Sequence, residues 1–122
     1  MSFLFNMSIP GDTGFLEPLL ELATKVAGYA GYQARDAEQI ASTIREGAAE
    51  AIRLTSAAPV PIEILFRTQA ERFEVTLSYE HAAPDRPVPP RPVNGFVCNR
   101  EGHLNICRLS KDLPSKIGRA HV

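Results

Sequence analysis

The sequence is poor in cysteine, in excess charge and in long apolar runs, and each absence excludes a class of protein. Thirteen basic residues against fourteen acidic ones leave a formal net charge of -1, so no general field attracts nucleic acid or an anionic membrane. No apolar segment approaches the roughly 20 residues that span a bilayer, and the first residues lack the features of a signal peptide. We therefore expect a cytoplasmic protein that binds neither nucleic acid nor membrane.

Two cysteines, Cys98 and Cys107, lie in apolar segments joined by a turn. Paired strands would bring them near each other, so a disulfide is one interpretation and two reduced, half-buried thiols are the other. Because nothing marks the chain for secretion, the reduced state is favoured. The chain has no CxxC pair and no close Cys/His cluster, so the sequence predicts no metal site.

The length of 122 residues and the 44% of hydrophobic residues indicate one domain with one core. We expect this domain to occupy residues 1–114 and to be followed by a flexible tail, 115–122. Residues 2–9 predict a first strand. Apolar residues then recur every three or four positions, which predicts a helix from Leu16 to about Ala30 and a second helix after Ala34.

Beyond Pro59 the apolar period changes from near 3.6 to 2, which predicts a hairpin of strands over 60–67 and 73–80. Five prolines between 81 and 94 predict a stiff, extended loop. Segments 96–99 and 104–109 predict another hairpin, with Gly102 free to adopt positive φ in its turn. Two helices must then cover one face of a mostly antiparallel sheet, which is a two-layer α+β sandwich.

The order of elements and four segments carry a resemblance to a known family. They are residues 9–11 before the first helix, 27–32 at its end, 40–52 in the second helix, and 102–114 at the close. In these the chain resembles the histidine-kinase-like (GHKL, or Bergerat) ATPases, in particular the bacterial anti-sigma factors that act as serine kinases on anti-anti-sigma proteins. The similarity spans nearly the whole chain, and its specificity comes from the order of the motifs.

The resemblance implies a nucleotide site whose positions can be matched. The family's Glu-x-x-x-Asn motif supplies a general base and a magnesium ligand; here Glu46 holds the Glu position and Glu50 replaces the Asn. The family's Asp-x-Gly, whose Asp accepts a hydrogen bond from the adenine amino group, matches Tyr79 and His81. The proline-rich segment 84–92 replaces the glycine-rich lid, and prolines lack the N–H donors that bind phosphate.

These replacements lead us to expect that ATP binding is lost. Glu50 would set a second negative charge near Glu46 and the phosphates, and the Tyr79 ring would occupy the space meant for adenine. The predicted protein is a regulator of the anti-sigma type that binds a sigma factor or an anti-anti-sigma protein, with Glu46 as a vestigial general base and with homodimers as in the family. The alternatives are an active serine-protein kinase that uses ATP and magnesium, and an unrelated α+β module.

The same residues have simpler interpretations in a folded domain. Glutamates such as Glu46 and Glu50 are most often solvated, and Tyr79 would serve equally as a core tyrosine. A proline-rich loop is more often a rigid connector than a polyproline ligand. Tyr29 and Tyr32 are expected to form a packing corner at the end of the first helix.

Overall fold

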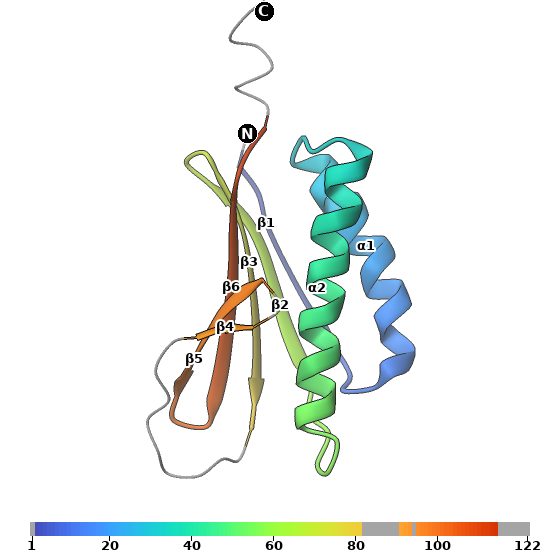
Figure 1. Ribbon diagram of the computed structural model, residues 1–122, viewed down its shortest axis with the longest axis vertical. Helices are drawn as coiled ribbons and strands as arrows, with labels where there is room; N and C mark the ends of the chain where they lie inside the picture. Colours follow the sequence, from blue (N-terminus) through green and yellow to red (C-terminus); the bar gives the residue numbers. More distant parts are fainter. Residues whose placement is uncertain (1, 82–90, 94, 115–122) are drawn as a thin grey trace, which may run out of the picture.

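Two helices and an antiparallel sheet form the two layers of the protein (Figure 1). The computed structural model describes residues 2–81, 91–93 and 95–114. Helices α1 (Leu16–Tyr29) and α2 (Ala34–Leu54) lie side by side on one face of the sheet. The α+β sandwich predicted from the sequence is confirmed. The predicted tail, 115–122, and the greater part of the proline-rich loop lie outside the described residues.

The described strands make one sheet in the spatial order β1-β2-β3-β6-β5-β4, with every neighbouring pair antiparallel. They are β1 (Leu4–Ile9), β2 (Ile62–Gln69), β3 (Arg72–Glu80), β4 (Arg91–Val93), β5 (Phe96–Glu101) and β6 (Leu104–Asp112). The sequence predicts only an extended loop over 81–94, so strand β4 within it is a difference. Pro92 lies opposite Val97 in this strand, and an edge strand tolerates a residue that has no N–H.

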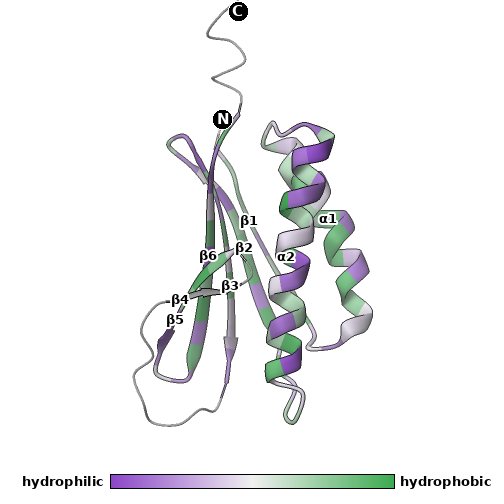
Figure 2. Ribbon diagram, in the orientation of Figure 1, coloured by the Kyte–Doolittle hydropathy of each residue, from purple (hydrophilic) through white to green (hydrophobic). Residues whose placement is uncertain are grey.

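The core lies between the layers because side chains on a strand alternate between its two faces. Figure 2 shows hydrophobic residues along both the strands and the helices. Burying each large apolar side chain contributes roughly 1.5–3 kcal/mol. The largest fully buried side chains are Phe66, Phe73, Phe96, Leu19, Ile40, Ile44, Ile62, Ile64, Leu77 and Val75. Between them, α2 buries alanines such as Ala41 and Ala48, whose small size lets this helix approach the sheet closely.

Local signals place the ends of the helices. A 3-10 turn, Thr13–Phe15, precedes α1, and the Asp12 side chain accepts a hydrogen bond from the Gly14 N–H before it. Pro18 lies in the first turn of α1, as predicted, where its missing N–H costs nothing. Between the helices Gly31 has a φ of 114°, a conformation that glycine adopts without steric cost.

The expectation of two reduced cysteines is wrong in this structure, because a disulfide joins Cys98 and Cys107. The sequence predicts a four-residue turn over 100–103, whereas β5 and β6 are joined by the two residues Gly102 and His103. The tighter turn shifts the strand register and sets the cysteines directly opposite each other, with their Cα atoms 4.0 Å apart. Gly102 has a φ of 64°, which confirms the predicted positive φ.

Within the described part of the chain, no helix is both long and apolar enough to cross a membrane.

Candidate functional site

The two glutamates of the matched Glu-x-x-x-Asn motif lie one turn apart on α2. The side chain of Glu46 is 55% exposed, and its carboxylate lies 3.7 Å from Arg45 Nη2. Glu50 is half-buried and accepts hydrogen bonds from Arg53 on both of its oxygens, at 3.1 Å and 2.6 Å. This bidentate geometry is a strong form of ion pair, and the hydrogen bond raises the pKa of the Arg53 guanidinium. The oxygens that a metal would need therefore already face a cation.

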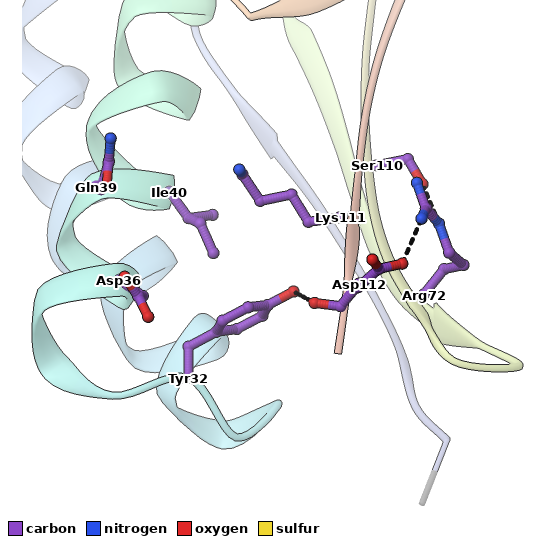
Figure 3. Close-up of a pocket in the computed structure, with 8 residues that line it drawn as sticks. All are labelled: Tyr32, Asp36, Gln39, Ile40, Arg72, Ser110, Lys111 and Asp112. Atoms are coloured by element: carbon purple, nitrogen blue, oxygen red, sulfur yellow. Dashed lines mark hydrogen bonds and ion pairs between the residues drawn. The ribbon is translucent and has the colours of Figure 1, made fainter. Parts of the chain in front are cut away.

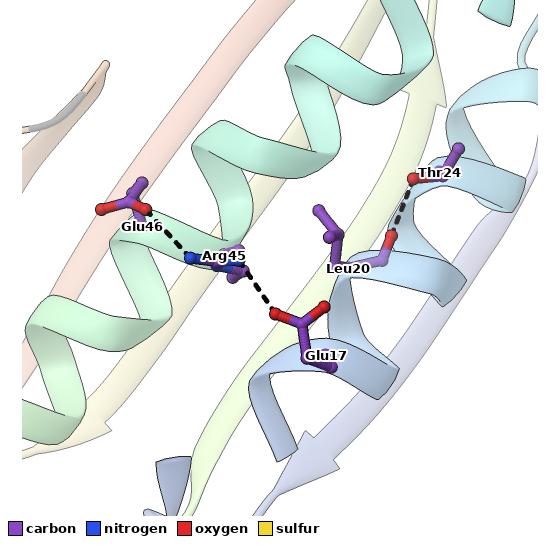
Figure 4. A network of polar contacts seen from close by, with 5 residues as sticks. All are labelled: Glu17, Leu20, Thr24, Arg45 and Glu46. Carbon is purple, nitrogen blue, oxygen red and sulfur yellow. Dashed lines mark hydrogen bonds and ion pairs between the residues drawn. The ribbon is translucent and has the colours of Figure 1, made fainter. Parts of the chain in front are cut away.

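Arg45 connects the same part of α2 to α1 (Figure 4). Its Nη1 donates a hydrogen bond to Glu17 Oε2 at 2.9 Å, while Nη2 faces Glu46. Because Glu17 is largely exposed, this contact contributes at most about 1 kcal/mol to stability. A general base must lie within hydrogen-bond reach of the proton that it removes. The group that the Glu46 carboxylate faces here is the Arg45 guanidinium.

A phenyl ring fills the space beneath this part of α2. Phe96, the first residue of β5, is 1% exposed and lies against Gly47. A Cβ atom added to Gly47 would stand 2.7 Å from Phe96 Cε2 and 2.8 Å from Leu77 Cδ1. Such distances are far inside van der Waals contact, so only glycine lets helix, ring and β3 meet here.

The residue before the ring makes a second close approach to α2. Gly95 has a φ of +88°, and a Cβ there would stand 2.9 Å from Thr43 Cγ2. Sequence reasoning did not identify Gly47, Gly95 or Phe96 as site residues. A signal was present, however, because a glycine inside a helix costs about 1 kcal/mol relative to alanine and calls for a packing reason.

The two positions matched to the Asp-x-Gly motif lie at the end of β3. Tyr79 is buried on the same side of the strand as Leu77, facing the helices. His81 follows the strand: its N–H donates to the His103 carbonyl at 2.8 Å, and its own carbonyl accepts a hydrogen bond from Arg100 Nη2. Leu77, Tyr79 and Phe96 thus belong to one buried layer under α2, while His81 is held by backbone contacts at the strand end.

A pocket of about 390 Å³ lies between the first half of α2 and the end of β6 (Figure 3). Tyr32 Oη donates a hydrogen bond to the Asp112 carbonyl at 2.6 Å across it. Burial, together with the charge of Asp112, raises the pKa of Tyr32. Arg72 contacts Ser110 and Asp112 from the neighbouring strand, and Figure 3 shows Lys111 extending from β6 toward α2.

An apolar groove of about 370 Å³ runs between β1 and α1, with Phe3, Phe5 and Val26 in its lining. Leu4 is 67% exposed and Tyr29 is 75% exposed beside it. The predicted packing corner is confirmed for Tyr32, whose ring stands edge-on to Phe73, whereas Tyr29 stands edge-on to Phe3 and is otherwise exposed.

A third, open pocket of about 630 Å³ lies where 10–13 faces 59–61. None of these three pockets is lined by the four matched positions, Glu46, Glu50, Tyr79 and His81.

Over residues 2–81, 91–93 and 95–114, no group of three or more His, Cys, Asp or Glu side chains is arranged to hold a metal ion. A scan against protein-family models found no match, and a search of the curated proteins found none.

Proposed function

We propose that this protein is a bacterial, cytoplasmic regulator of transcription that resembles an anti-sigma factor and acts by binding another protein, with its nucleotide site lost. The observation that carries the proposal is the contact between Phe96 and Gly47. A purine and its phosphates would have to lie against α2 and the end of β3, and here Phe96 and Leu77 both pack directly against Gly47, which leaves no room for a ligand at this contact.

The charges around the matched positions support the same conclusion. Glu50 stands where the family has a neutral magnesium ligand, and Arg53 neutralises it from the same helix. Binding a metal there would require breaking a bidentate pair and bringing Glu46, a second carboxylate, toward the phosphates. Tyr79, at the position of the adenine-binding Asp, is a buried ring. The two replacements act against the same ligand.

Protein binding is supported by the β1 edge of the sheet. The hydrogen bond from the Thr68 N–H to the Phe3 carbonyl sets the phase of the β1–β2 ladder. Because such ladders alternate, the N–H and C=O groups of Leu4, Asn6 and Ser8 point away from β2. No charged residue interrupts β1, although natural edge strands are usually protected by charge. An apolar edge beside an apolar groove suits a protein partner.

The resemblance suggests which partners to test: a sigma factor, an anti-anti-sigma protein, or a second copy of the chain. Size-exclusion chromatography with light scattering separates the last from the others. Leu4→Glu should abolish the association, because it places a charge on the free edge. Val97→Glu is the matched control, since Val97 is 55% exposed on β5 at the other side of the sheet. Equal effects of both variants would remove β1 as the docking surface.

The alternative is an active serine-protein kinase, which the retained and exposed Glu46 favours. Calorimetric titration with Mg-ATP and Mg-ADP separates the two functions. The proposed regulator should show no saturable heat, which means a Kd weaker than about 1 mM. Micromolar binding, with phosphate transfer that Glu46→Gln abolishes and Glu38→Gln preserves, would establish the kinase instead. Glu38 is a suitable control because it is an exposed glutamate on the same helix.

A further inference from the structure

The disulfide between Cys98 and Cys107 occupies a particular place in the sheet. Cys98 lies two residues after Phe96 on β5, and Cys107 lies opposite Leu77 of β3 on β6. Side chains two residues apart on a strand share a face, so both sulfurs lie on the helix-facing side. Both residues are almost completely buried. The bond therefore belongs to the layer that contacts Gly47 from below.

Three features of β5 hold Phe96 in place. The first is its ladder with β6, from Val97↔Arg108 to Glu101↔Leu104. The second is the close approach of Gly95 and Phe96 to Thr43 and Gly47. The third is the disulfide, which is the one covalent side-chain link between β5 and β6 among the described residues.

The outer side of β5 is weakly supported. Its neighbour there is β4, a strand of three residues, whereas β3 on the far side of β6 pairs with β6 over nine positions. Opening free energy is lowest where few neighbours hold a segment. If the disulfide were broken, β5 would be the strand to separate first, and Phe96 would leave Gly47 with it.

We infer that the Cys98–Cys107 bond is a reversible thiol–disulfide site that controls how firmly Phe96 is held against Gly47 of α2. In the oxidised protein the ring is locked beneath Gly47; in the reduced protein β5 opens and exposes Gly47 and Leu77. The reductant is a small or protein dithiol. Disulfides in the proposed cytoplasmic compartment are usually transient or redox-sensing rather than structural.

Reduction transfers two electrons and two protons from the dithiol to the protein disulfide. When the edge at β5 opens transiently, a thiolate of the dithiol attacks one Sγ, the bond between the two protein sulfurs breaks, and its electron pair leaves on the other Sγ, which takes up a proton. The second thiol of the reductant then displaces the first protein sulfur, which is protonated in turn. The dithiol becomes a disulfide, and the protein gains two electrons and two protons.

Amide hydrogen exchange of the full chain tests this inference, with dithiothreitol as the dithiol. Thiol alkylation and intact mass first establish the oxidised and reduced states. The bond closes a short loop, with a sequence separation of 9. From the chain entropy of that loop, reduction should speed exchange of the β5 amides on the order of 50-fold. Amides of β2, at the other side of the sheet, open only with the whole fold, so in the reduced protein they should exchange more slowly than those of β5.

The double variant Cys98→Ser, Cys107→Ser is the matched control: it should exchange as fast as the reduced protein and should not respond to dithiothreitol. Equal rates in both redox states would overturn the inference, because β5 would not need the bond. In the reduced protein, exchange at β5 no faster than at β2 would also overturn it, since β5 would then open only together with the whole sheet. So would a bond that resists a buffer of thioredoxin-type redox poise. None of these measurements depends on whether ATP binds, so this inference and the proposed function can each be wrong while the other is right.

Discussion

The two sides of the sheet are built in opposite ways. On the β1 side the edge strand has no charged residue, and Leu4 and Tyr29 are exposed beside an apolar groove. On the β5 side a disulfide joins neighbouring strands and a buried ring lies directly against Gly47. The first side has unpaired backbone groups beside apolar surface, whereas on the second side Phe96 and both cysteines are buried in the core.

This contrast indicates which side of the sheet offers room for a partner. Tight packing at α2 and β5 removes space that a ligand would need, whereas the open β1 edge offers what a partner strand or helix would bind. We therefore expect substitutions on the β5 side to change stability and substitutions on the β1 side to change association.

Replacement of Phe96 by alanine should have the largest effect on stability. Removing a fully buried phenyl ring costs about 3–5 kcal/mol, a large part of the 5–15 kcal/mol typical of a native domain. Val97→Ala, one residue along but exposed, should stay within about 0.5 kcal/mol of the wild type. Urea unfolding followed by circular dichroism measures both. Similar free energies of unfolding for the two variants would show that Phe96 does not pack in the core beneath α2.

Removal of the disulfide should come next. The loop between Cys98 and Cys107 is short, with a separation of 9 residues, so the chain-entropy estimate gives about 2.5 kcal/mol. The same unfolding experiment on oxidised protein and on the double serine variant measures the difference. A variant as stable as the oxidised protein would mean that the bond does not constrain the unfolded chain.

Gly47→Ala should destabilise the protein by about 1–2 kcal/mol, because overpacking against Phe96 and Leu77 exceeds the gain of about 1 kcal/mol in helix propensity. Gly28→Ala is the matched control in α1, where an added Cβ meets nothing within 4 Å. That change should stabilise by up to about 1 kcal/mol. The two variants are thus predicted to differ in sign, and a stabilising Gly47→Ala would contradict the close contact.

Tyr32→Phe removes the hydrogen bond to the Asp112 carbonyl and should cost about 0.5–1 kcal/mol. Burial raises the pKa of folded Tyr32 above its usual 10.0. The neutral phenol is therefore favoured in the folded state, so the contribution is fully present below pH 10 and is lost as the pH rises through the folded value. Unfolding at neutral and at alkaline pH, with Tyr29→Phe as the control, measures this. A difference between Tyr32→Phe and the wild type that persists in strong alkali would contradict it.

Leu4→Lys should have the smallest effect on folding and the largest on association. Because Leu4 is mostly exposed, its replacement should change stability by less than about 0.5 kcal/mol. Light scattering and partner titration should nevertheless show lost binding. A variant that associates like the wild type would place the interface elsewhere.

Local periodicity explains which parts of the fold could be predicted. The three-and-four spacing of α2 and the alternation of β2 and β3 depend on neighbours in sequence, so they identify the layers. Strand β4 could not be predicted because prolines argue against a strand. The turn at Ala70 has a positive φ without a glycine, so its tightness has no sequence signal either.

The candidate site was harder to predict because its decisive contacts are long-range. Glu46, Glu50 and Tyr79 were found by matching motifs. The arginines that face the two glutamates, Arg45 and Arg53, lie close to them in sequence. The contact of Phe96 with Gly47 joins residues almost fifty positions apart, and the disulfide depended on a two-residue shift in register. The first contact follows from no local pattern, although the glycine inside α2 indicates a close neighbour; the second was one of two interpretations that the local pattern left open.

The packing of Phe96 and Leu77 against Gly47 is tested most directly by nuclear magnetic resonance, with the Gly47 amide and the Leu77 methyl groups as probes during a titration with Mg-ATP. These signals should stay in place up to millimolar nucleotide, because Gly47, Phe96 and Leu77 are already packed directly against one another. Saturable shifts of both probes at micromolar nucleotide would contradict it.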